Sequence, residues 1–103
     1  SLETIAEIIA KKVYYRSAEA KPRDIFDIAA AARSRPIAVV DALRDFPEEV
    51  ARTRERLERL NPEFVNRAIA QLMILPGYQA SAGDSPDAAI AVLDEALSSA
   101  SQT

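Results

Sequence analysis

The stretch between residues 7 and 27 holds the side chains best suited to chemistry: Lys12, Arg16, Arg23, Asp24 and Asp27. Lys12 follows Ile8 by four residues and Ile5 by seven, so it lies next to or within the apolar stripe of a predicted helix. A cation at such a position must extend to solvent, pair with an acid or point into a polar cleft. Periodicity alone favours the first of these, a lysine at the rim of the core.

The two aspartates share one edge of the next predicted helix. Asp24 and Asp27 are three residues apart, and Arg23 precedes Asp27 by four. Asp24 falls in the first turn, where free N–H groups and the helix dipole stabilise a carboxylate. Asp27 is bracketed by apolar residues, so its carboxylate needs a cationic partner or a metal. An ion pair with Arg23, Lys12 or Arg16 competes here with a polar site between the first two helices, and the pattern alone favours the ion pair.

Two aspartates at this spacing are a weak sign of a metal site. Magnesium takes oxygen ligands and usually relies on substrate phosphates to complete its shell, so two carboxylates do not hold it unaided. The sequence has no Cys and no His, which excludes disulfides, thiolate sites, imidazole bases and Ser–His triads. Any chemistry must come from carboxylates, Lys, Arg, Ser or Tyr, and we predict no metal ligands in this chain.

These residues are expected to sit in one all-α domain spanning residues 1–103, an irregular bundle of about six helices. Prolines at the first helical position support several of the helix starts. The predicted helices cover residues 3–18, 22–33, 36–44, 47–60, 62–75 and 86–97, with a loop over 77–84 and a polar tail over 98–103. The helix over 62–75 is the most apolar and is predicted at the centre of the core. Ile5, Ile8, Ile9 and Val13 of the first helix and Ile37 of the third are predicted to face the core, and the alanines of 29–32 to let a neighbouring helix approach closely.

Charge and hydropathy narrow the range of partners. The formal net charge of -3 argues against a nucleic-acid-binding surface, and the arginines of residues 52–59 alternate with glutamates. No apolar run approaches the roughly 20 residues that span a bilayer. The absence of Cys is compatible with a reducing compartment, and we expect a cytoplasmic protein without membrane contact.

The motif residues resemble a known family. The run Glu7-Ile-Ile-Ala-Lys-Lys-Val-Tyr-Tyr-Arg16, followed by Pro22-Arg-Asp-Ile-Phe-Asp-Ile28, is similar to the end of the AbiEii/AbiGii toxin-type nucleotidyltransferases. Those proteins resemble the wider polymerase-β-like nucleotidyltransferase fold. The resemblance covers roughly residues 3–30. It implies that Lys12 contacts nucleotide phosphates, that Asp27 is the motif aspartate of the catalytic site with Asp24 beside it, and that Arg16 and Arg23 support them.

The resemblance also implies a missing part. The family's metal-binding motif, a Gly-Ser turn followed by paired acids on a strand, belongs to an N-terminal α/β half, and this sequence has no Gly-Ser dipeptide. We therefore expect the C-terminal part of a longer protein. Magnesium and a nucleoside triphosphate are expected for a full-length member, and no cofactor for this chain alone.

Three functions compete at this point. The first is the helical part of a nucleotidyltransferase from a toxin–antitoxin or phage-defence system, active only with its N-terminal domain. The second is a non-enzymatic module that binds a protein, such as an antitoxin or a second copy in a homodimer, with the charged helix over 47–60 as one surface. Nucleic-acid binding through the arginines of residues 52–67 is the weakest, because of the glutamates between them.

Overall fold

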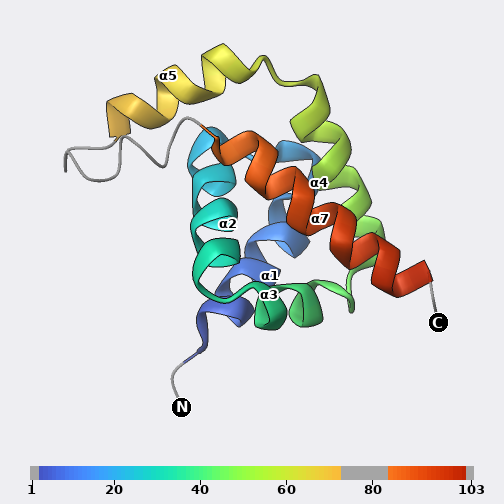
Figure 1. Ribbon diagram of the computed structural model, residues 1–103. Coiled ribbons are helices and arrows are strands. Elements are labelled where there is room, and N and C mark those ends of the chain that lie inside the picture. Colours follow the sequence, from blue (N-terminus) through green and yellow to red (C-terminus); the bar gives the residue numbers. More distant parts are fainter. Residues whose placement is uncertain (1–2, 73–83, 102–103) are drawn as a thin grey trace.

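Within residues 3–72 and 84–101, which the computed structural model describes, all regular structure is helical. The elements are α1 (Ile5–Arg16), η1 (Ser17–Glu19), α2 (Pro22–Ser34), α3 (Pro36–Leu43), α4 (Pro47–Arg59), α5 (Pro62–Leu72) and α7 (Ser85–Ser101) (Figure 1). This confirms the prediction of an all-α fold of about six helices. Residues 73–75 of the predicted fifth helix, the loop over 77–83 and residues 102–103 of the predicted tail lie outside the described residues.

Local sequence explains where the helices begin. Proline occupies the first turn of α2, α3, α4 and α5, where its fixed φ suits the helix and its missing N–H is no loss. The side chain of Thr4 accepts a hydrogen bond from the backbone N–H of Glu7 at 3.1 Å and so caps α1. Asn61 Oδ1 accepts one from the N–H of Glu63 at 2.9 Å, as its position before Pro62 predicts.

The centre of the core is α7. It crosses the molecule in Figure 1 and packs against α2, α3 and α4. Small residues are buried on both helices, Ala29 and Ala31 on α2 and Ala89 and Ala96 on α7, while Leu93 is fully buried. The alanines of α2 were predicted to let a neighbouring helix approach closely, and α7 is the helix on which α2 packs most extensively.

The prediction that residues 62–75 form the centre of the core is wrong for the described part of that helix. α5 lies at the edge of the molecule in Figure 1 and packs mainly on α2. Val65 and Ile69, four residues apart, are buried, whereas Phe64 and Leu72 are exposed. The apolar composition of a helix indicates that part of its surface is buried. It does not indicate whether the helix lies at the centre of the bundle or at its edge.

The predicted core face of α1 is confirmed in part. Ile9 and Val13 are buried as predicted, whereas Ile5 and Ile8 are exposed. Ile37 on α3 was likewise expected in the core and is 79% exposed. In each case a run of adjacent apolar residues offers two possible faces, and packing against the rest of the bundle selects one of them.

The charged helix α4 is tied by ion pairs rather than left free. Arg59 pairs with Glu55 at 2.5 Å, and Arg52 pairs with Glu49 at 3.4 Å. Arg54 pairs with Glu58 and, across the bundle, with Asp94 of α7. In the described part of the chain, no helix has the length and apolar character needed to cross a membrane.

Candidate functional site

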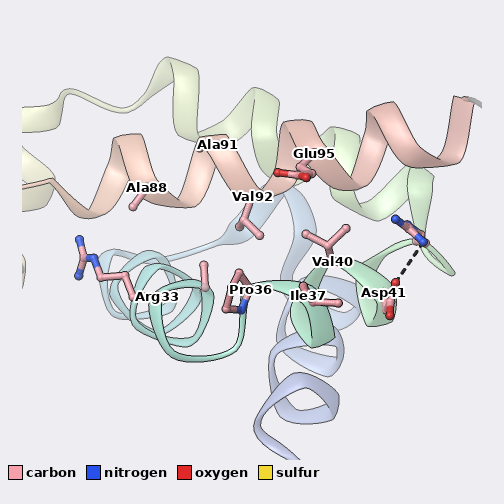
Figure 2. Close-up of a pocket in the computed structure, with 11 residues that line it drawn as sticks. Arg33, Pro36, Ile37, Val40, Asp41, Ala88, Ala91, Val92 and Glu95 are labelled. Atoms are coloured by element: carbon pink, nitrogen blue, oxygen red, sulfur yellow. Dashed lines mark ion pairs between the residues drawn. The ribbon is translucent and has the colours of Figure 1, made fainter.

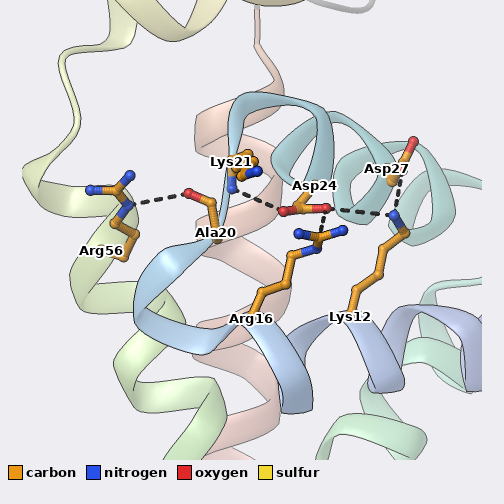
Figure 3. A network of polar contacts seen from close by, with 7 residues as sticks. All are labelled: Lys12, Arg16, Ala20, Lys21, Asp24, Asp27 and Arg56. Carbon is orange, nitrogen blue, oxygen red and sulfur yellow. Dashed lines mark hydrogen bonds and ion pairs between the residues drawn. The ribbon is translucent and has the colours of Figure 1, made fainter.

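A tight turn after α1 brings the motif residues of α1 and α2 together. Ser17 ends α1 with φ 36° and ψ -108°, and its N–H donates to the Val13 carbonyl. The short η1 turn follows, and Arg56 Nε of α4 donates to the Ala20 carbonyl at 3.2 Å (Figure 3). The link between the two helices is therefore held at both ends, and α2 begins beside α1.

Asp24 is the anchor of the site. Its side chain is only 5% exposed, and three donors surround it. The backbone N–H of Lys21 lies 2.9 Å from Oδ2, while Arg16 Nε and Lys12 Nζ lie 3.1 and 3.5 Å from Oδ1 (Figure 3). The first of these bonds caps the start of α2, and the other two join α2 to α1. A buried carboxylate with this many donors is well compensated.

Lys12 bridges the two aspartates. Its Nζ lies 3.1 Å from Asp27 Oδ2 and 3.5 Å from Asp24 Oδ1, both on α2. The Lys12 side chain is 26% exposed and that of Asp27 is 31% exposed, so this pair stands at the edge of the bundle rather than inside it. The expectation that an ammonium and a carboxylate meet where the first two helices touch is confirmed.

Arg16 joins this cluster, and Arg23 does not. The carboxylates of Asp24 and Asp27 turn toward Lys12 and Arg16 of α1, while Arg23 is exposed on α2. The ion pair between Arg23 and Asp27 that the four-residue spacing allows gives way to the pair across the helices. We use the name clasp for Lys12, Arg16, Asp24 and Asp27.

The clasp opens onto a groove. Eight residues line a space of about 500 Å³. They belong to α1, to the residue before its cap and to the turn between α1 and α2: Glu3, Ile8, Lys11, Lys12, Tyr15, Arg16, Glu19 and Lys21. Four cations and two carboxylates therefore face this groove. A lysine ammonium has three donors and an arginine guanidinium five, so Lys12 and Arg16 keep donors beyond those that their aspartates accept. The groove thus presents fixed cations to an anionic ligand.

Lys11 is a further cation at the groove. Its ammonium lies 2.7 Å from Glu3 Oε2, and the hydrogen bond with Glu3, helped by its charge, raises the pKa of Lys11 above its ordinary value of 10.5. Lys11 is therefore an ammonium at neutral pH. It is exposed, and its pair with Glu3 is screened by water.

No group of three or more acidic, Cys or His side chains in residues 3–72 and 84–101 is arranged to hold a metal ion. Asp24 and Asp27 also face cations, which compete with any metal for the same oxygens.

Sequence reasoning missed part of the groove. Ile8, Tyr15 and Lys21 line it beside the predicted cations. Their signal was present, because Ile8 precedes Lys12 by four residues and Tyr15 follows it by three, which places them on one side of the helix. Ile8 was assigned to the core, and Tyr15 was given no role.

Comparisons of the chain with protein-family models, with curated proteins and with solved structures give no match in any of the three. The resemblance to the AbiEii/AbiGii toxin-type family rests on the motif residues themselves.

Proposed function

We propose that this chain is the helical C-terminal part of an AbiEii-like nucleotidyltransferase of the toxin–antitoxin or phage-defence type. In this proposal Lys12 and Arg16 contact the phosphates of a nucleoside triphosphate, and Asp27 is the motif aspartate of the catalytic site. The observation that carries it is the position of Lys12 Nζ, 3.1 Å from Asp27 and at the edge of an open groove.

The clasp is suited to this role because its cations are fixed in place. Lys12 and Arg16 are each anchored by Asp24, so little side-chain freedom is lost when a phosphate arrives. A lysine binds phosphate as a point charge and arginine through a planar set of donors, and the two stand one helical turn apart. Asp27 holds Lys12 from the other side and keeps the ammonium at the mouth of the groove.

Transfer of a nucleotide requires more than these residues. We propose that the N-terminal nucleotidyltransferase domain supplies the metal ligands, since the carboxylates of the clasp already face cations. The chain contributes phosphate contacts and positioning, and an antitoxin protein is a further proposed partner.

Nucleotide titration of the 103-residue chain tests the proposal. Binding of ATP, with and without magnesium, is followed by isothermal titration calorimetry or by amide chemical shifts. Lys12→Met and Arg16→Met are each expected to weaken ATP binding by about tenfold or more, because each removes a charge-assisted hydrogen bond. Arg59→Met is the matched control, since Arg59 also pairs with an acid but lies on α4. Unchanged ATP affinity in folded Lys12→Met refutes the proposed role.

A second candidate function is a protein-interaction module, and one groove favours it. Between α3 and α7 the surface is hollowed by a space of about 380 Å³ whose floor includes Pro36, Val40 and Val92 (Figure 2). Ile37 at its edge is 79% exposed, and the pair Arg44–Asp41 stands at the rim. An apolar floor with a charged rim suits an amphipathic partner helix.

Sedimentation with and without Ile37→Glu separates the two candidates. If the groove joins two copies of the chain, the variant dissociates the dimer and leaves ATP binding as it was. A wild-type chain that is monomeric and binds ATP refutes the homodimer and supports the first candidate.

A further inference from the structure

Tyr15 is a large exposed side chain that the clasp does not explain. It is 76% exposed and lies in the last turn of α1. A single exposed aromatic is ordinary on a protein surface. Tyr15, however, shares its groove with Lys12 and Arg16 and with the exposed side chain of Ile8. One groove therefore combines an aromatic ring, an aliphatic wall and fixed cations.

We propose that Tyr15 is the platform on which the base of the nucleoside triphosphate stacks, while the phosphates lie toward Lys12 and Arg16. This rests on the proposed function and adds the base-binding part of the same site. Tyr15 follows Lys12 by three residues and directly precedes Arg16 on α1. A volume of about 500 Å³ falls within the range of roughly 300–1,000 Å³ that small-molecule sites occupy.

The Tyr15 ring contacts one neighbouring ring by its edge. Its centroid lies 5.0 Å from that of Tyr14 in an edge-to-face arrangement, with 90° between the planes. The Tyr14 ring in turn contacts Phe46, which precedes α4, at 5.3 Å. Tyr15 therefore has an aromatic neighbour, while most of its surface stays open to a base.

Stacking makes the platform tolerant of the base. Every nucleobase offers a π face, and stacking on an aromatic ring does not read hydrogen-bond donors and acceptors. The groove therefore selects for a nucleotide over a bare polyphosphate, and the identity of the base has a small effect. Ile8, which lies earlier on α1 and lines the same groove, offers apolar contact to the nucleobase.

The test compares ATP with inorganic tripolyphosphate, which has the phosphates without the base. Tyr15→Ala is expected to weaken ATP binding by about fivefold or more and to leave tripolyphosphate binding as in the wild type. Tyr15→Phe keeps the ring and should retain ATP affinity to within about twofold. Phe64→Ala, the truncation of another exposed aromatic side chain, on α5, is the matched control. Far-ultraviolet circular dichroism confirms that each variant folds.

The outcomes separate this inference from the proposed function. If Tyr15→Ala binds ATP like the wild type while Lys12→Met loses it, the base platform is refuted and the phosphate site stands. If Tyr15→Ala weakens ATP and tripolyphosphate equally, the ring shapes the groove and does not stack a base, which also overturns the inference. A wild-type chain that binds neither ligand refutes both proposals.

Discussion

The strongest prediction concerns Asp24, whose removal should destabilise the fold far more than removal of Asp27. Both lie on α2 and both pair with Lys12. They differ in burial, because Asp24 is buried with three donors while Asp27 is half-buried with Lys12 as its ion-pair partner.

The expected loss of stability follows from the contacts that each carboxylate makes. Asp24→Ala removes a cap of α2, which is worth about 1 kcal/mol. It also leaves Lys12 and Arg16 without their shared anion, and breaking a fully buried pair costs about 3–5 kcal/mol. Because Lys12 and Arg16 are partly exposed, solvent takes over much of that loss. We expect about 3 kcal/mol in total for Asp24→Ala, and about 1 kcal/mol or less for Asp27→Ala, as for a surface ion pair.

Urea unfolding followed by circular dichroism at 222 nm measures this difference. The slope with denaturant should be the same in all variants, so that the midpoints report stability alone. Asp24→Asn separates the two contributions, since it keeps the shape and an oxygen acceptor for Lys21 but removes the charge; we expect about 1–2 kcal/mol. In a thermal scan, Asp24→Ala should melt roughly 12–24 °C lower, at about 4–8 °C per kcal/mol for a domain of this size.

Two results would refute this reasoning. An Asp24→Ala variant within about 0.5 kcal/mol of the wild type would mean that the three contacts contribute nothing net, as many surface contacts do. Equal losses for Asp24→Ala and Asp27→Ala would mean that burial does not distinguish the two carboxylates.

Three further predictions concern single positions. Ser17→Gly should raise the free energy of unfolding by up to about 1 kcal/mol in the same urea assay, because glycine adopts the positive φ of this residue without strain. Ala29→Leu should lower it by about 1–3 kcal/mol, since residue 29 is fully buried and the larger side chain overpacks its surroundings. Glu3→Gln should lower the pKa of Lys11 toward 10.5 in an NMR titration; in the wild type the pKa is raised, so the Glu3–Lys11 attraction is present below pH 10.5 and is lost as the pH rises through the higher folded value.

Much of the fold was predictable because it depends on local signals. Prolines and caps mark the starts of α2, α4 and α5, and the alanines of α2 indicate a close neighbour. Burial was harder, as Ile37 and Phe64 show, because each belongs to an apolar run with more than one possible face. The choice among faces depends on contacts between helices distant in the sequence.

The candidate site could also be predicted in part from the sequence. The spacing of Asp24 and Asp27 placed both on one edge of α2, and the apolar stripe placed Lys12 near the core. The sequence left open which cation meets which acid, because Arg23 competes locally for Asp27. The turn at Ser17 decides this, since it brings α2 back beside α1 and presents both aspartates to Lys12 and Arg16. The spacing of residues within a helix does not predict the turn at Ser17.

Stability alone does not account for the whole clasp. The pair Arg16–Asp24, with the Lys21 cap, already joins α1 to the start of α2 through a buried carboxylate. The pair Lys12–Asp27 adds a half-exposed contact of the kind that contributes about 0–1 kcal/mol, and it costs Lys12 side-chain freedom. Lys12→Met is therefore the most informative substitution in the chain. A small loss of stability joined to a large loss of ATP affinity assigns Lys12 to a ligand, and the reverse assigns it to the fold.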